Sequence, residues 1–218
     1  AENLNNVQQR LGASDVQAKA LARKYNIVPT GQQLAMMNDG TSLLRTARWG
    51  MRLNLGSDLP GGKAVSMVGT VASTVTGKVQ DPVFNARSEK LTGPVWKPLA
   101  KQRSLIPATS WFEFQGTGPS KSAWVIFPSD QDIFCFAGLW KITKDGQRQF
   151  TILTTQAPAR ISHIHARMPV VLRPEHEAHW LDPATPLQEA MHLLQPDPNG
   201  VLGFLRRNPR VGGTKGEN

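Results

Sequence analysis

The sequence is poor in the features that secreted and membrane proteins need. Its 218 residues include a single cysteine, Cys135, which excludes an internal disulfide and a thiolate metal cluster. No run approaches the roughly 18 consecutive apolar residues of a transmembrane helix, and residues 1–10 are polar rather than the apolar centre of a signal peptide. These absences favour a protein of the reducing cytoplasm.

Acidic residues are also scarce relative to basic ones. There are 25 Lys and Arg against 16 Asp and Glu, which gives a formal net charge of +9. The hydrophobic fraction of 39% is enough to bury a core, so a disordered chain is excluded. Excess positive charge points first to nucleic acid as a partner, although a solvated basic surface is an alternative explanation. We therefore expect a cytoplasmic protein associated with the nucleoid.

Short β-like runs dominate the middle of the chain. Leu4, Val7 and Leu11 at helical spacing predict one helix, and a capping box from Ser14 to Gln17 predicts a second. Apolar runs on both sides of Asn38 predict a hairpin within 34–51. Further β-branched or aromatic runs predict strands at 104–114, 122–127, 133–142, 150–155 and 168–172. Two helices should follow, one over 174–180 and one starting at Thr185 and Pro186 and ending before Pro196.

No internal repeat or change in composition divides the chain. We therefore predict a single domain over 1–218, of α+β class, with a curled, barrel-like, mainly antiparallel sheet flanked by short helices. The segment 56–79 is rich in Gly, Ser, Thr and Val and is expected to be a long loop or an exposed β-arm. Residues 203–218 are expected to form a basic tail.

Polar residues interrupt the apolar strands at four places, and chemistry is expected there. The clusters are residues 25–30, 85–89, 111–114 and 162–169. In the third, alternation places Glu113 on the face opposite Phe112 and Phe114. If that face lines a pocket, burial would raise the pKa of Glu113 and suit it to proton transfer; if it faces water, Glu113 is an ordinary solvated carboxylate.

The fourth cluster contains two histidines, His163 and His165. Their spacing of two could place both on one strand face and bind a metal, but no Asp, Glu or Cys stands nearby to complete a site. A single histidine that acts as acid, base or hydrogen-bond donor beside Arg167 is favoured, with a structural histidine as the alternative. We expect no metal and no cofactor.

Seven motifs taken in order are more informative than any one of them. They are Tyr-Asn-Ile-Val-Pro-Thr (25–30), Arg-Trp-Gly (48–50), Asn-Ala-Arg-Ser-Glu (85–89), Trp-Phe-Glu-Phe (111–114), Phe-Ala-Gly-Leu-Trp (136–140), Thr-Ile-Leu-Thr-Thr (151–155) and Ile-His-Ala-Arg-Met-Pro-Val-Val-Leu (164–172). Together they resemble the SOS-response-associated peptidase (SRAP) family, over a core of residues 25–182.

The resemblance implies a sensor of abasic sites in single-stranded DNA, working as a monomer. Members of the family process their own N-terminus, and the exposed N-terminal cysteine condenses with the sugar aldehyde to give a thiazolidine crosslink, a peptidase, hydrolase or lyase-like activity. By position, Asn85 would orient the terminus or the sugar, Glu113 would relay protons, and His165 would stabilise charge on the opened sugar. Arg87 and Arg167 would hold phosphates, and the Thr154 hydroxyl would contact the DNA backbone.

The sequence departs from the family pattern in two ways. Residue 1 is Ala, with no Cys-Gly-Arg near it, and Cys135 lies in an apolar run typical of a core. Either the native chain begins ahead of Ala1, the interpretation we favour, or this member has lost its crosslinking cysteine. Second, the stretch between Trp49 and Phe84 contains no aromatic residue that could wedge against a base. Affinity would then depend more on phosphate contacts, and steeply on salt.

Other functions remain open at this point. The first alternative is a non-catalytic binder of single-stranded DNA or DNA junctions that has lost the nucleophile. A protease acting on other proteins would need a triad that we do not find in the sequence. A hydrolytic metalloenzyme built on His163 and His165 is the weakest alternative.

Overall fold

The structure is a computed structural model that describes residues 2–17, 27–41, 43–53, 65–68, 71–74, 81–118, 121–196 and 200–207. Its helices are α1 (Glu2–Leu11), α2 (Ala159–Ser162), α3 (Pro174–Leu181) and α4 (Leu187–His192), with 3-10 turns η1 (Ser88–Lys90) and η2 (Lys97–Leu99). Its strands are β1 (Asp15–Gln17), β2 (Gln32–Met37), β3 (Leu43–Trp49), β4 (Val65–Val68), β5 (Val71–Thr74), β6 (Asn85–Arg87), β7 (Arg103–Ala108), β8 (Trp111–Gln115), β9 (Ser122–Pro128), β10 (Phe134–Ile142), β11 (Arg148–Gln156), β12 (Arg167–Pro169), β13 (Val171–Leu172) and β14 (Leu202–Arg207).

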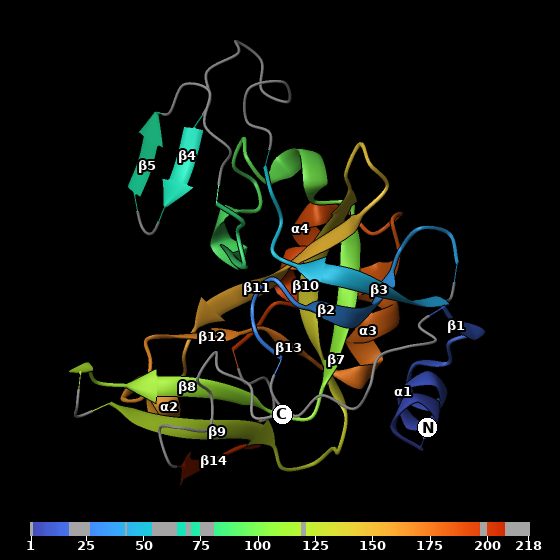
Figure 1. Ribbon diagram of the computed structural model, residues 1–218. Helices are drawn as coiled ribbons and strands as arrows, with labels where there is room; N and C mark the ends of the chain where they lie inside the picture. Colours follow the sequence, from blue (N-terminus) through green and yellow to red (C-terminus); the bar gives the residue numbers. More distant parts are fainter. Residues whose placement is uncertain are drawn as a thin grey trace.

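Strands β2, β3, β7, β10 and β11 close into a barrel (Figure 1). Antiparallel pairing runs from β3 to β2, to β7, to β10 and to β11. The ring closes because β11 also pairs with β3 in parallel, where Gln149 faces Arg48 and Phe150 faces Trp49. The expected α+β domain with a curled, mainly antiparallel sheet is therefore confirmed, with a single parallel pair inside the barrel ring.

Shorter strands extend the barrel on the side where the polar clusters lie. β6 pairs in parallel with β11, and β12 pairs with β11 antiparallel. A separate three-stranded sheet in the order β14-β9-β8 lies beside α2 (Figure 1). Helix α3 packs against β7 and β10. The polar clusters of β6, β8 and β12 thus come from different edges of the two sheets.

Alternation along the strands sends side chains into two hydrophobic clusters. In β10, Cys135 and Ala137 join the cluster that also receives Val7 of α1 and Trp180 of α3. The neighbouring Phe134 and Phe136 join a second cluster, shared with the three-stranded sheet and α2. Both faces of β10 are therefore buried, as its long apolar run requires.

A buried cation ties the helices to the barrel. Arg103 of β7 is fully buried, and its guanidinium donates hydrogen bonds to the carbonyls of Ala100, Trp180, Asp182 and Thr185. A buried arginine is tolerated only when its donors are hydrogen-bonded. Here main-chain carbonyls accept these hydrogen bonds, and no carboxylate among the described residues forms an ion pair with Arg103. Burial lowers the pKa of Arg103 from its ordinary value.

The N-terminal prediction of two helices is only half right. α1 is present, but Asp15–Gln17, the start of the second predicted helix, forms strand β1 instead, paired in parallel with β3. The backbone N–H and C=O groups of Asp15–Gln17 are thus paired with β3 and not with the side chains of a capping box. Residues 18–26, including Tyr25 and Asn26 of the first motif, lie outside the described part of the chain.

The remaining predicted segments differ in detail. α4 begins at Leu187 with Pro186 as its cap, and the Thr185 hydroxyl donates to the His179 carbonyl rather than capping the helix. Within the predicted loop or β-arm, β4 and β5 form an antiparallel hairpin, and the rest lies outside the described residues. The beginning of the predicted basic tail, through Arg207, is strand β14, paired with β9.

Candidate functional site

The β6–β11 pair places three predicted site residues on one sheet face. Asn85 is paired with Ile152 and Arg87 with Thr154, and cross-strand partners project to the same side of a sheet. Both Asn85 and Arg87 are exposed. Within the described part of the chain, the Arg87 guanidinium makes no hydrogen bond or ion pair, so its donors are available to an anion.

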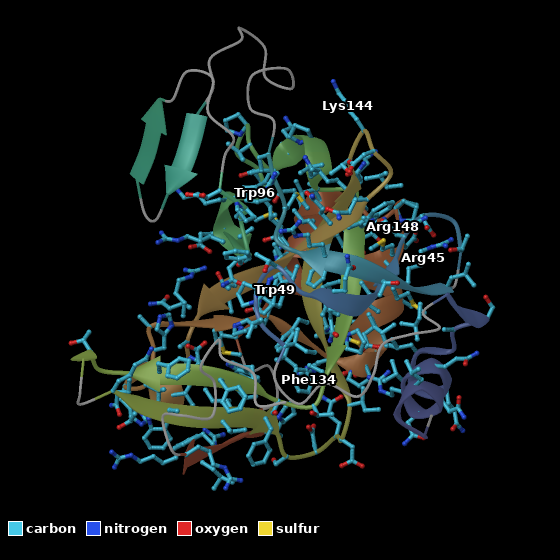
Figure 2. The ribbon with its side chains drawn as sticks, in the orientation of Figure 1. Arg45, Trp49, Trp96, Phe134, Lys144 and Arg148 are labelled. Atoms are coloured by element: carbon cyan, nitrogen blue, oxygen red, sulfur yellow. The ribbon has the colours of Figure 1, made fainter. Side chains whose placement is uncertain are left out.

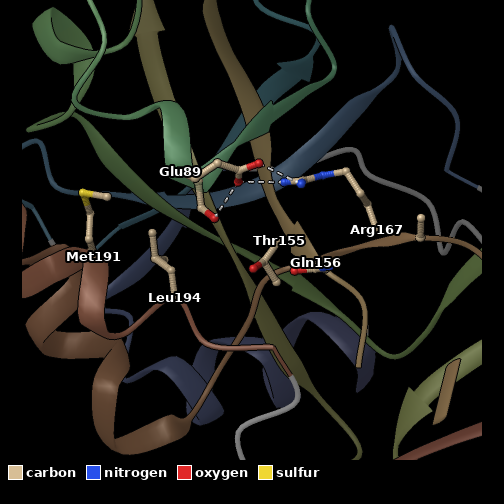
Figure 3. A pocket seen from close by; sticks show the side chains of 8 residues that line it. Glu89, Thr155, Gln156, Arg167, Met191 and Leu194 are labelled. Carbon is tan, nitrogen blue, oxygen red and sulfur yellow. Dashed lines mark hydrogen bonds and ion pairs between the residues drawn. The ribbon is translucent and has the colours of Figure 1, made fainter. Parts of the chain in front are cut away.

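Arg167 of β12, in contrast, is held by four hydrogen bonds. Its Nη1 and Nη2 donate to the two carboxylate oxygens of Glu89 at 2.8 and 2.9 Å (Figure 3). Nη2 also donates to the Thr154 carbonyl at 2.7 Å, and Nε to the Thr154 hydroxyl at 3.3 Å. Burial acts to raise the pKa of Glu89, but the hydrogen bond and charge of Arg167, aided by Arg87, outweigh it and leave that pKa below its ordinary value. Glu89 is thus a carboxylate that fixes Arg167 in place.

Glu113 and His165 form the second half of the site. The Glu113 side chain is only 19% exposed, and its Oε2 lies 3.9 Å from His165 Nδ1. Burial raises the pKa of Glu113 to about 7, although the nearby His165 ring and the indole of Trp111 act in the opposite direction. Glu113 is therefore a mostly buried carboxyl rather than an ordinary solvated one, and a pKa near neutrality suits it to proton transfer.

The backbone fixes the orientation of the His165 ring. Nδ1 lies 2.7 Å from the main-chain carbonyl oxygen of Arg167 and 3.2 Å from the main-chain N–H of the same residue, so the Arg167 backbone holds this side of the ring. Among the described residues, no hydrogen bond involves Nε2, the other nitrogen of the ring. Arg167 therefore links the halves: its main chain holds His165, and its side chain holds Thr154 and Glu89.

A cavity of about 570 Å³ opens beside the Glu89–Arg167 pair. Figure 3 shows the ion pair along one wall, with Met191 and Leu194 across from it. The lining residues are Ser88, Glu89, Thr155, Gln156, Ala166, Arg167, Met191 and Leu194. Four of these lining residues were not among the predicted site residues: Glu89, Gln156, Met191 of α4 and Leu194, which follows α4. Of the four, only Glu89 lies in one of the polar motifs, as the last residue of Asn-Ala-Arg-Ser-Glu.

The two histidines of the fourth cluster do not share a strand face. Both lie in the segment between α2 and β12, where His163 contacts the rings of Trp124 and Phe204 while His165 lies near Glu113. Among the described residues, no group of three or more His, Cys, Asp or Glu could hold a metal ion. Cys135 is fully buried, and burial raises the pKa of its thiol well above the ordinary value.

Comparison with known proteins identifies the family. The family model for SOS response associated peptidase (SRAP) matches residues 1–213. The chain belongs to the SRAP family. Among curated SRAP relatives, it is 33% identical over 181 residues to the abasic site processing protein YoqW of Bacillus subtilis, covering 79% of this chain and 73% of that one. It is also 33% identical over 165 residues to the abasic site processing protein YoaM of the same species, covering 73% and 66%.

Solved structures share the SRAP fold seen here. A crystal structure of a protein from Bordetella bronchiseptica superposes with a TM-score of 0.68 at 18% identity, over 94% of this chain and 95% of that one. Among the helices that the structure describes, none is long and apolar enough to cross a membrane.

Proposed function

We propose that this SRAP protein recognises abasic sites in single-stranded DNA and captures them in a covalent thiazolidine crosslink. The nucleophile would be an N-terminal cysteine outside the 218 residues, exposed by self-processing, as the family resemblance implies. The names of the relatives YoqW and YoaM support the abasic-site part, and the net charge of +9 supports DNA as the partner. A cytoplasmic location at the nucleoid belongs to the same proposal.

The observation that carries the proposal is the Glu113–His165 pair. A carboxyl group with a pKa of about 7 stands beside a histidine whose ring is held in place by the Arg167 backbone. Capture of an abasic sugar requires repeated proton transfers near neutral pH, and a group that titrates there serves as both acid and base. Arg87 and Asn85 lie on the sheet face that carries Thr154, available to a phosphate and a sugar.

The proposed chemistry assigns each step to one group. Protonated Glu113 gives its proton to the ring oxygen as the C1′–O4′ bond breaks, and then takes the proton of the C1′ hydroxyl to leave an aldehyde. The terminal amine adds to that aldehyde, water leaves, and the thiol adds to the resulting imine to close the ring. His165 stabilises the charge that develops on the opened sugar, and Asn85 orients the amine.

The test is a denaturing gel of the full-length protein with an oligonucleotide that contains one abasic site. We expect a shifted band that disappears when the N-terminal cysteine is replaced, and that forms about 100-fold more slowly in Glu113→Gln. Glu175→Gln, at an exposed α3 position, is the matched control and should react at the rate of the unchanged protein. No shifted band with the full-length protein would refute the crosslinking proposal.

A second candidate is a DNA binder without covalent chemistry. It is supported by the burial of Cys135, because the 218 residues by themselves offer no accessible thiol. This candidate predicts that the full-length protein shifts the oligonucleotide on a native gel while giving no shifted band on a denaturing gel. The two gels together separate the two functions.

A further inference from the structure

Three aromatic rings meet at the three-stranded sheet, and none of them has a part in the proposed chemistry. They belong to Trp124 of β9, Phe204 of β14 and His163, which follows α2. The His163 ring centroid lies 6.1 Å from that of Trp124 and 5.9 Å from that of Phe204. The interplanar angles are 87° and 69°, so neither ring covers the imidazole with a parallel stack.

The aromatic triad of Trp124, His163 and Phe204 lies next to the Glu113–His165 pair. Glu113 is the cross-strand partner of Trp124 in the β8–β9 ladder, so the two side chains project from the same face of the sheet. His163 stands two residues before His165, in the same short segment. Arg206, partner of Trp124 on its other side, adds a positive charge to that face.

The triad is rigidly mounted. Trp124 and Phe204 are half-buried and pack against the hydrophobic cluster that contains Trp111 and Phe136. The main-chain carbonyl of His163 accepts a hydrogen bond of 2.8 Å from Gln115 Nε2, which ties this segment to β8. His163 itself is exposed. The imidazole is thus the exposed ring of the three, and it contacts the half-buried rings of Trp124 and Phe204.

We propose that the aromatic triad is a stacking subsite for the nucleobase next to the abasic position in single-stranded DNA. A base beside an abasic sugar has lost one stacking neighbour, so one of its faces is free. Histidine and other aromatic rings serve as stacking platforms for unpaired bases because every base has a π-face.

The proposal rests on the proposed function, and its test separates the two. The probe is a single-stranded oligonucleotide with a tetrahydrofuran abasic analogue, which cannot crosslink, flanked by the fluorescent base 2-aminopurine. Binding should quench the fluorescence of 2-aminopurine at the flanking position but not at a position five nucleotides away. His163→Ala should remove the flanking quench and weaken binding about tenfold, whereas His163→Phe should retain both.

His176→Ala, in α3 and outside the triad, is the matched control and should behave like the unchanged protein. If His163→Ala binds and quenches like the unchanged protein, the subsite is refuted while the proposed function stands. If the unchanged protein fails to bind the abasic oligonucleotide, both the proposed function and the subsite are refuted.

Discussion

Glu113 illustrates how a single residue changes character when the chain folds. In the sequence it is one acid between aromatic neighbours on a strand. In the folded protein its side chain is mostly removed from water and lies beside His165, and its pKa moves to about 7. Burial disfavours the ionised form, so part of the folding free energy maintains a carboxyl group that titrates near neutrality.

Glu113→Gln should therefore remove a pH-dependent loss of stability. The pKa is raised by burial from 4.5 to about 7, so the native state binds this proton more tightly than the unfolded chain. The contribution of this proton to the free energy of unfolding is fully present below about pH 4.5. It is lost as the pH rises through about 7, which lowers the free energy of unfolding by about 3 kcal/mol.

Urea unfolding at pH 5 and pH 8 tests this. The unchanged protein should lose about 2 to 3 kcal/mol more than Glu113→Gln between the two conditions. Glu175→Gln, at an exposed position, should keep the pH dependence of the unchanged protein. Equal losses in Glu113→Gln and the unchanged protein would show that the buried carboxyl does not titrate in this window.

At the scale of elements, an ion pair docks α1 on α3. Arg10 donates to both oxygens of Glu177 at 3.0 and 2.9 Å, and the Glu177 side chain is only 7% exposed. Burial raises the pKa of Glu177, and the hydrogen bond and charge of Arg10 oppose that rise. Loss of Arg10 would leave a mostly buried carboxylate without its cationic partner, with only the Cys135 side chain still hydrogen-bonded to it.

Arg10→Ala should accordingly destabilise the fold by about 3 kcal/mol at pH 8. The loss should shrink as the pH falls and Glu177 is protonated, because a group with a raised pKa destabilises only when it is ionised. The double variant Arg10→Gln with Glu177→Gln should recover part of the loss. Denaturant unfolding of these variants at pH 5 and pH 8 measures the loss of stability. If the loss in Arg10→Ala were the same at both pH values, the ion pair would be excluded as its source.

The barrel itself depends on close packing around β10. A Cβ atom at Gly138 would overlap with Ile106 Cδ1 and would lie 2.8 Å from the carbonyl oxygen of Thr151. The backbone atom cannot move without disturbing the β10–β11 ladder, which pairs Gly138 with Ile152. Glycine is therefore required at this point by space rather than by a special backbone conformation.

Gly138→Ala should lower the free energy of unfolding by about 2 kcal/mol. Adding Ile106→Val removes the Cδ1 atom and should recover part of the loss, while the contact with the Thr151 carbonyl keeps the rest. Thermal and urea unfolding of the single and double variants would measure both effects. If the double variant lost more free energy of unfolding than the two single variants lose together, this packing argument would be contradicted.

The N-terminal segment shows the limit of local patterns at this scale. The helical spacing of Leu4, Val7 and Leu11 correctly predicts α1, because one apolar face is enough to define a surface helix. The capping box from Ser14 to Gln17 does not lead to a helix, since Asp15–Gln17 pairs with β3 instead. A partner strand about thirty residues away along the chain decides the outcome, and a local window cannot contain it.

At the scale of the whole molecule, the net charge of +9 becomes useful only through its placement. Arg167 is engaged by Glu89, whereas Arg87 makes no ion pair among the described residues. Lys144 lies at the turn between β10 and β11 and points outward (Figure 2). Arg87→Gln and Lys144→Gln each remove one positive charge, but from different places on the protein.

Arg87→Gln should therefore weaken binding to single-stranded DNA and reduce the slope of log K against log salt by about 0.7, the value for one lost phosphate contact. Lys144→Gln should leave the slope unchanged. Fluorescence anisotropy with an abasic-analogue oligonucleotide at several salt concentrations measures both. The same change in slope for both variants would mean that only total charge matters, not a contact at Arg87.

The sequence by itself determined the fold class and the main strands, because alternating apolar patterns are local properties, and its short polar motifs supplied the candidate site residues. Only the tertiary structure decided which of these residues meet. The parallel β6–β11 register sets Asn85 and Arg87 on the face of Thr154, Glu89 holds Arg167, and burial tunes Glu113 beside His165. For the single cysteine the two agree: its place in an apolar run already predicted a core position, and packing on both faces of β10 buries it.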